Sequence, residues 1–296
     1  MDHVGRIFRP PSEAESLLLQ VTVGCSHNEC TYCAMYDLPE QNFRVKPWET
    51  VSRDIEEAGL LADAGYPIRR VFLCDGDALI LPTEKLLRIL RHLKERIPTV
   101  RRVGIYGDAR SILRKSPAEL TELRENGLGI VYHGAESGDD LVLSAVCKGS
   151  TADEAAEAAA RLKGAGIRHS VMVMLGLGGR EGSRSHAEKT AQLLTRMDPP
   201  FVGALTTTLV PGTPLFRAHE AGAFRLPDPF DMLEELRILI RDSQFTRCRF
   251  HSNHASNYLP LSLNLPADRD KALATLDQVL ARRDEEDLKP EGLRGL

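Results

Sequence analysis

The sequence lacks any long apolar run. No stretch approaches the ~20 consecutive apolar residues of a membrane-spanning helix, and Met1 to Pro10 contains no apolar region of the signal-peptide kind. An excess of charge of either sign is also missing, because 38 basic and 42 acidic residues leave a formal net charge of −4. This composition does not favour a membrane or a nucleic acid as partner. We expect a cytoplasmic protein.

Cysteine is scarce and unevenly distributed. Six cysteines in 296 residues are too few for the disulfide framework of a small secreted protein. Three are isolated, namely Cys74, Cys147 and Cys248. The other three share one short segment: Cys25, Cys30 and Cys33. This cluster is the most informative feature of the sequence.

Short apolar runs alternate with amphipathic segments along the chain. The runs are Leu17–Val23, Val71–Leu73, Val103–Tyr106, Ile130–His133, Val171–Leu175 and Phe201–Val210. Runs that are apolar throughout are typical of parallel strands covered on both faces. We therefore predict an α/β fold, a partial (β/α)6 TIM-like barrel of mostly parallel strands. Its core would span residues 1–215, and a short C-terminal extension over 216–296 would pack on the barrel within the same domain.

Two helices are expected in the C-terminal extension, near Asp231–Arg241 and Asp268–Arg282. Between them lies a polar stretch, His251–Tyr258, for which the sequence predicts no regular element. The last residues, Asp284 to Leu296, are rich in charge and are expected to fray.

The clustered cysteines have the spacing C-x4-C-x2-C, which places three thiolates on one loop at the end of the first predicted strand. Such a loop suits zinc or an iron–sulfur cluster. A structural zinc site takes four ligands, and a two-iron electron-transfer cluster would need Cys74 as its fourth. A four-iron cluster with three protein ligands leaves one iron open to a small molecule. We favour this third centre because catalysis needs an open position.

With Tyr32 just before its last cysteine, the loop resembles the cluster loop of radical S-adenosylmethionine (SAM) enzymes, whose commonest spacing is one residue shorter, C-x3-C-x2-C. The likeness extends from about Leu17 to Pro214. It most resembles the branch of oxygen-independent coproporphyrinogen oxidases and methylthiotransferases. The resemblance implies an oxygen-sensitive 4Fe-4S cluster on Cys25, Cys30 and Cys33.

The resemblance also implies the reaction. Such a cluster would cleave SAM reductively to a 5′-deoxyadenosyl radical that abstracts hydrogen from a small-molecule or peptide substrate, with electrons from a donor such as flavodoxin or ferredoxin. The sequence identifies neither the substrate nor a catalytic side chain. The alternative is an iron–sulfur electron-transfer protein whose cluster is fully ligated by the protein.

The remaining motifs also follow predicted strands, where parallel α/β folds bind ligands. By resemblance, Tyr32 and the strand-two motif Asp75, Gly76 and Asp77 would contact SAM, the motif at its methionyl amine; an ordinary β-turn is the alternative for Asp-Gly. Asp108 would contact SAM or the substrate, or cap the next helix.

Later motifs supply the rest of the implied cofactor site. Glu136 would accept from the ribose or the amine, and Ser137 and Lys148 would hold the carboxylate, although Lys148 is equally compatible with a solvated position. Met174 and Gly176 lie in a segment that resembles the adenine-packing one, with apolar core and a turn as the alternative.

A dense polar group marks the C-terminal region. It contains two histidines and two asparagines, His251, Asn253, His254 and Asn257. We interpret these four as candidate substrate-binding residues, with a structural role as the alternative.

Overall fold

The structure is a computed structural model that describes residues 1–295, so Leu296 lies outside the described residues. The described chain forms two compact units. Unit 1 comprises Met1–Asn28, Ala34–His133 and Glu157–His169, and unit 2 comprises Glu29–Cys33, Gly134–Ala156 and the residues from Ser170 onward. The expected division of a single domain into a core over residues 1–215 and an extension over 216–296 stays a prediction.

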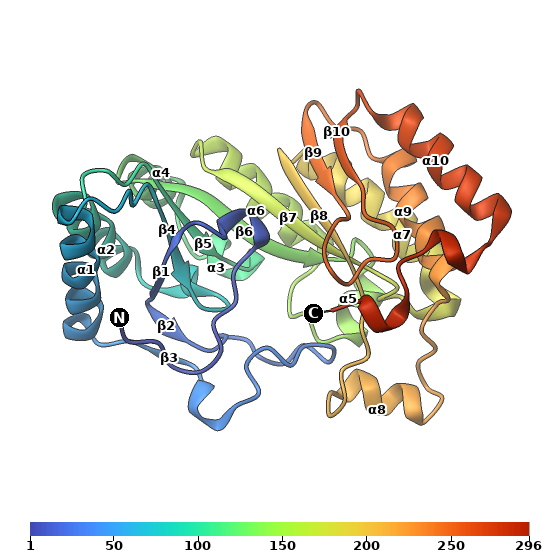
Figure 1. Cartoon of the computed structure of the whole chain (residues 1–296), viewed down its shortest axis with the longest axis horizontal. Helices are drawn as coiled ribbons and strands as arrows, with labels where there is room; N and C mark the ends of the chain where they lie inside the picture. The colour runs from blue at the N-terminus through green and yellow to red at the C-terminus, as the bar shows by residue number, and fades with distance from the viewer. Residues whose placement is uncertain (296) are drawn as a thin grey trace. The chain divides into compact units, whose positions relative to one another are not determined.

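The strands alternate with helices along the chain (Figure 1). The strands are β1 (Leu17–Gln20), β2 (Thr22–Val23), β3 (Arg44–Val45), β4 (Arg70–Cys74), β5 (Arg102–Tyr106), β6 (Leu128–Glu136), β7 (Arg168–Leu175), β8 (Phe201–Thr206), β9 (Cys248–His251) and β10 (Ser262–Leu265). The helices are α1 (Trp48–Asp63), α2 (Thr83–Arg96), α3 (Ala109–Leu113), α4 (Pro117–Glu125), α5 (Asp140–Ala145), α6 (Ala152–Gly164), α7 (Gly179–Met197), α8 (Pro214–Glu220), α9 (Pro229–Asp242) and α10 (Arg269–Arg282).

Unit 1 is built on parallel strands in the order β1-β4-β5-β6. Leu17 pairs with Val71, and Val71 pairs in turn with Val103, so the apolar runs lie in register. Helices α1 and α2 pack against each other. The strand and helix side chains between them form one large buried apolar cluster. Burial on both faces explains why these strands are apolar throughout.

Unit 2 continues the α/β pattern. Strand β8 pairs in parallel with β7 and with β9, and β10 closes the unit antiparallel to β9. Helix α9 packs against both α7 and α10. The prediction of an α/β fold with mostly parallel strands is confirmed, and all six predicted runs contain strands.

Strands β3, β9 and β10 escaped the sequence analysis. Strands β9 and β10 have four residues each, and exposed and buried positions alternate along β9. Such short segments contain no apolar run, so the sequence predicts no regular element in the stretch that begins at His251. The two predicted C-terminal helices are present as α9 and α10.

The expected fraying of the C-terminal end is wrong for the described residues. Glu285–Asp287 and Glu291–Leu293 form 3-10 turns. The guanidinium of Arg294 lies over the Tyr258 ring, 4.0 Å from its centroid, and donates to the Ser256 carbonyl at 2.6 Å. Stacking and charge-assisted hydrogen bonding hold this charged segment against Ser256 and Tyr258.

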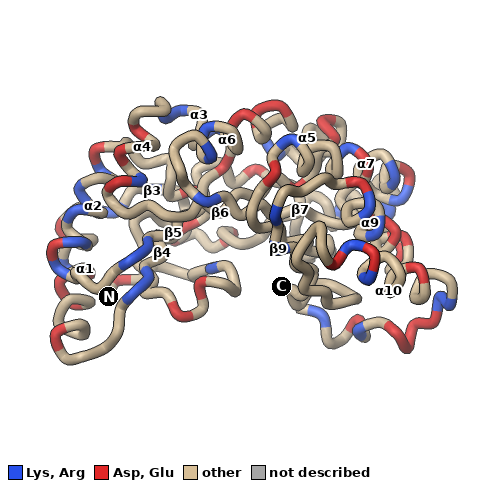
Figure 2. Tube along the Cα trace, turned by 90° about the horizontal axis from the view of Figure 1, so that it is seen from above, with Lys and Arg blue, Asp and Glu red and all other residues tan. Residues whose placement is uncertain are grey.

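Charged side chains are interleaved along the helices. Figure 2 shows Lys and Arg alternating with Asp and Glu on α1, α2, α7 and α9. The near-zero net charge is therefore distributed without a long tract of one sign. Within residues 1–295, no helix combines the length and apolarity needed to cross a membrane.

Candidate functional site

In unit 1, Asp75 joins the end of β4 to the start of the cysteine loop. Its side chain is fully buried, and Oδ2 accepts from Gln20 Nε2 at 2.7 Å and from the Gly24 amide at 3.2 Å. Its second oxygen, Oδ1, is buried without a hydrogen-bond partner. Burial raises the pKa of this carboxyl to about 6. A buried, unsatisfied carboxylate oxygen indicates a position built for a donor.

Gly76 lies where a side chain would collide with the cysteine loop. A Cβ at this position would stand 2.9 Å from Cys25 Cβ and 2.7 Å from Tyr36 Cε2. The hydroxyl of Tyr36 is itself buried without a hydrogen-bond partner. Glycine therefore allows the backbone after β4 to approach Cys25 closely.

Asp77 is hydrogen-bonded on both oxygens. Oδ2 accepts from Ser26 Oγ and Ser111 Oγ, each at 2.6 Å, and Oδ1 accepts from the Asp108 amide at 3.1 Å. Burial, and then the nearby charge of Asp108, raise its pKa to about 6. Asp77 thus ties the residue after Cys25 to the loop after β5.

Asp108 caps helix α3, because its Oδ1 accepts from the Ser111 amide at 2.7 Å and its Oδ2 pairs with Arg110 at 2.8 Å. Of its two expected roles, the structure shows the helix cap.

In unit 2, Cys30 and Cys33 belong to one turn in which the Cys33 amide donates to the Cys30 carbonyl at 3.1 Å. Both side chains are half-buried, as is that of Cys25 in unit 1. Tyr32 packs with Met174 against an apolar cluster of Val142, Val146 and Leu177. Burial, followed by the charges of Glu136 and the two cysteines, raises the pKa of Tyr32.

Glu136 and Lys148 form a buried ion pair, with Lys148 Nζ 2.9 Å from Glu136 Oε1 and each side chain 11% exposed. A solvated position for Lys148 was the alternative expectation, and the structure contradicts it. Glu136 has a φ of 64°, a left-handed conformation that is uncommon outside glycine. A Cβ on Gly134 would lie 2.1 Å from Glu136 Oε1, so glycine makes room for the pair.

Ser137 is fully buried and is hydrogen-bonded to a histidine that the sequence analysis missed. Its Oγ lies 2.7 Å from His186 Nδ1, and His186 Nε2 lies 2.8 Å from the Met174 carbonyl. Burial lowers the pKa of His186, which favours the neutral ring.

A second missed residue, Glu235 on α9, accepts from the Gly176 amide at 2.7 Å and from Ser183 Oγ at 2.5 Å. The polar positions Ser183, His186 and Thr190 recur at helical spacing on α7 and form the one sequence signal that would have pointed to this network.

Replacing Glu235 by glutamine should flatten the pH dependence of stability. Burial raises the pKa of Glu235 from 4.5 to about 7. The pKa of Glu235 is higher in the folded protein than in the unfolded one. The contribution of its neutral carboxyl to the unfolding free energy is therefore complete below about pH 4.5 and is lost as the pH rises through 7. Relative to wild type, Glu235→Gln should gain about 3 kcal/mol in unfolding free energy between pH 4.5 and 8. Urea unfolding of the metal-free protein measures this, and parallel curves would contradict it.

The four polar C-terminal residues make hydrogen bonds within unit 2. His251 Nδ1 and Asn253 Nδ2 both lie near Ser262 Oγ, at 3.2 and 3.3 Å. His254 Nδ1 lies 2.9 Å from Ser256 Oγ. Asn257 bonds to β8 through both side-chain ends, accepting from Thr206 Oγ1 at 2.8 Å and donating to the Ala204 carbonyl at 2.9 Å. Their substrate-binding role stays a prediction.

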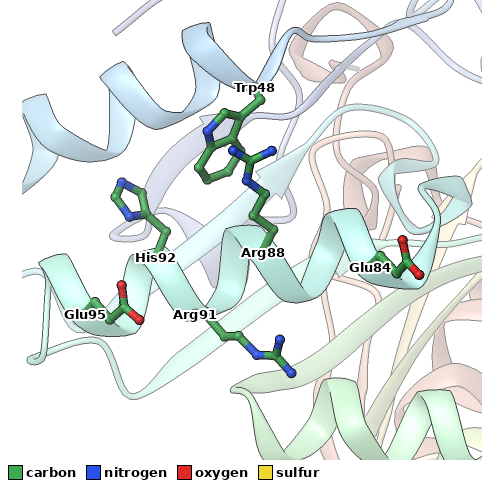
Figure 3. Close-up of a pocket in the computed structure, with 6 residues that line it drawn as sticks. All are labelled: Trp48, Glu84, Arg88, Arg91, His92 and Glu95. Carbon is green, nitrogen blue, oxygen red and sulfur yellow. The ribbon is translucent and has the colours of Figure 1, made fainter.

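A cavity of about 280 Å³ lies on α1 and α2, and none of the predicted site residues lines it. It is lined by Trp48, Glu84, Arg88, Arg91, His92 and Glu95. Figure 3 shows the Arg88 guanidinium over the Trp48 ring, 3.8 Å from its centroid. Arg91 pairs with Glu122 at 3.0 Å, and His92 Nε2 lies 3.0 Å from Glu56 Oε1.

Within residues 1–295, no three His, Cys, Asp or Glu side chains are grouped so that they could hold a metal ion. The assignment of the three cysteines to a cluster therefore depends on their spacing in the loop and on family relationships.

Comparison with known families identifies a match to the Radical SAM superfamily over residues 19–194, more than half of the chain. A search of curated protein sequences found no match.

Solved structures share the fold. A crystal structure of methylornithine synthase has a TM-score of 0.53 and 18% identity, covering 78% of this chain and 63% of that one. Coproporphyrinogen III oxidase from Escherichia coli, described as a radical SAM enzyme, has a TM-score of 0.56 and 16% identity over 76% of this chain and 51% of that one. The radical SAM methyltransferase TsrM from Kitasatospora setae, with cobalamin and a 4Fe-4S cluster bound, has a TM-score of 0.57 and 16% identity over 72% of this chain and 38% of that one. The chain thus spans less than two thirds of each of these proteins.

Proposed function

The chain belongs to the radical SAM superfamily of enzymes, and we propose on this basis that Cys25, Cys30 and Cys33 hold a 4Fe-4S cluster with one iron left open for SAM. The observation that carries the proposal is the C-x4-C-x2-C loop inside the matched segment. When bound, such a cluster supplies the electron that splits SAM into methionine and a 5′-deoxyadenosyl radical, which takes hydrogen from a small molecule or peptide.

The donors around the loop fit this assignment. Three half-buried thiols are the soft ligands that iron–sulfur clusters take. Gly76 provides close backbone approach beside Cys25. The buried Oδ1 of Asp75 and the buried hydroxyl of Tyr36, both without hydrogen-bond partners, supply polar atoms that a ligand would satisfy.

Asp75 is the better of the two strand-two carboxylates for the SAM ammonium. Its Oδ1 is unsatisfied, whereas both oxygens of Asp77 are engaged by Ser26, Ser111 and the Asp108 amide. An ammonium would complete the hydrogen bonding of Asp75 and favour its charged form. We assign Asp77 to holding the cysteine loop.

In unit 2, Glu136 and Lys148 offer the ribose hydroxyls an acceptor and the methionyl carboxylate a cation. Tyr32 and Met174 supply apolar surface beside them, which would suit the adenine and exclude water. Ser137 donates a hydrogen bond to Nδ1 of the neutral His186 ring, so we propose that it supports this segment and does not bind the carboxylate directly.

Outside the cluster and SAM, the proposal includes a one-electron donor such as flavodoxin or ferredoxin and a cytoplasmic location. A reducing compartment suits a protein with six cysteines and an oxygen-sensitive cluster.

The rival function is electron transfer through a cluster with Cys74 as an additional ligand. The Cys74 thiol is fully buried and donates to the Phe72 carbonyl at 3.6 Å. Burial, and then the charge of Asp75, raise its pKa well above the ordinary value. Because the thiolate is the metal ligand, these surroundings favour the three-cysteine centre.

Anaerobic reconstitution with iron and sulfide tests the proposal. We expect the absorption and electron paramagnetic resonance (EPR) spectra of a four-iron cluster, a change in those spectra on adding SAM, and 5′-deoxyadenosine after reduction with dithionite. A fully loaded cluster whose spectra ignore SAM and which yields no 5′-deoxyadenosine would overturn it.

A further inference from the structure

Two segments of unit 2 that are predicted to bind SAM are joined by a buried histidine. One segment ends β6 and carries Ser137, and the other ends β7 and carries Met174. His186, on α7, reaches both, with Nδ1 2.7 Å from Ser137 Oγ and Nε2 2.8 Å from the Met174 carbonyl. Its side chain is 2% exposed. It therefore connects the two segments directly from a buried position.

The hydrogen bonds around this ring determine its proton positions. A carbonyl only accepts, so His186 Nε2 carries the proton and donates to Met174. In the neutral ring Nδ1 then accepts from Ser137, whose Oγ in turn accepts from the Asp139 amide at 2.9 Å. Each atom in this series of hydrogen bonds, from the Asp139 amide through Ser137 and His186 to the Met174 carbonyl, is paired. The network therefore specifies one arrangement of the two segments.

Glu235 secures the second segment from another helix. Its Oε2 accepts from the Gly176 amide at 2.7 Å, and its Oε1 accepts from Ser183 Oγ at 2.5 Å. The same Oε2 lies 3.8 Å from His186 Nε2. Helix α9 therefore reaches the segment that α7 already holds through His186.

Close backbone approach completes the arrangement. A Cβ on Gly138 would lie 2.2 Å from the Lys189 carbonyl oxygen of α7, and one on Gly178 would lie 2.8 Å from His186 Cβ. Any larger residue would push the segments away from α7.

We propose that His186 and Glu235 are positioning residues that lock the segments after β6 and β7 together and thereby set the affinity for SAM. This inference rests on the proposed function. Neither residue needs to touch SAM: each acts through Ser137, Met174 or Gly176.

The test compares three His186 variants, Glu235→Gln and one control variant of the reconstituted protein. His186→Phe keeps a ring of similar size and removes both hydrogen bonds. His186→Asn places an oxygen near the position of Nδ1 and retains the Ser137 contact, and His186→Gln places an amide near Nε2 and retains the Met174 contact. Val279→Ala, which trims a buried residue on α10, controls for a general loss of stability.

We expect His186→Phe to weaken SAM binding roughly ten- to hundredfold, by analogy with the loss of a hydrogen-bond partner behind the ligands of a metal site. His186→Asn and His186→Gln should each recover part of the lost SAM affinity. Glu235→Gln should weaken SAM binding less than His186→Phe does. Iron content and the EPR spectrum without SAM should stay as in wild type, and saturating SAM should restore the cleavage rate. Val279→Ala should bind SAM like wild type.

The outcomes separate the two levels of the account. If wild type binds SAM and His186→Phe binds it within twofold, the positioning role is wrong and the proposed function stands. If His186→Phe loses iron as well, or saturating SAM does not restore its rate, the residue supports the fold at large and the positioning role is again wrong. If loaded wild type binds no SAM, the proposed function fails and the inference with it.

Discussion

Cys30→Ala should lower the iron content of the reconstituted protein from about four atoms to well below one per chain, and SAM cleavage should fall to background. Two thiolates on so short a loop cannot hold a four-iron cluster with one open iron. Iron and sulfide analysis, with quantification of 5′-deoxyadenosine after reduction, measures both effects.

Two other cysteines provide matched controls. Cys248→Ala removes a buried thiol on β9 and should leave iron content and cleavage unchanged. Cys74→Ser should also retain the cluster, because the Cys74 thiol is buried and hydrogen-bonded to Phe72. Loss of the cluster in Cys74→Ser to the same extent as in Cys25→Ser would favour the electron-transfer function and contradict ours.

Lys148→Met should both destabilise the protein and abolish SAM binding. The Glu136 side chain is only 11% exposed, and the substitution removes the cation that neutralises it. Removing one partner of a buried ion pair lowers the unfolding free energy by about 3 kcal/mol. Urea unfolding of the metal-free protein measures the stability, and titration of the loaded protein with SAM measures binding.

The control for this pair is an exposed one. Arg184 pairs with Glu188 on α7 with its side chain 82% exposed, so Arg184→Met should change stability by less than about 0.5 kcal/mol. The double variant Glu136→Gln, Lys148→Met removes both charges and should recover much of the lost stability without recovering SAM binding. Recovery of binding in the double variant would show that the pair is only structural.

The parts of the fold that could be predicted are those in which local sequence and burial agree. The runs at Val71 and Val171 are apolar because both faces of their strands are covered. Ser116, Pro117 and Glu119 have the sequence pattern of a helix start, and the structure shows a complete capping box there at the beginning of α4. Strand β9 was not readable, because alternate residues face solvent and no apolar run forms.

The candidate site was predictable only in part, because its hydrogen bonds join residues distant in sequence. Spacing identified the cysteine loop, and the resemblance to radical SAM enzymes pointed to the carboxylates after β4. It could not show that Asp77 is engaged by Ser26 and Ser111, or that Asp75 retains an unsatisfied oxygen. His186 lies 49 residues from Ser137, and only the folded chain brings the two together.

The central claim is that one iron of the cluster lacks a protein ligand and takes SAM. Mössbauer spectroscopy of the iron-57-loaded protein, with and without SAM, tests it most directly. We predict that the parameters of one iron in four change on adding SAM while the other three stay constant. A spectrum in which no iron responds to SAM, or in which the centre contains only two irons, would contradict the account.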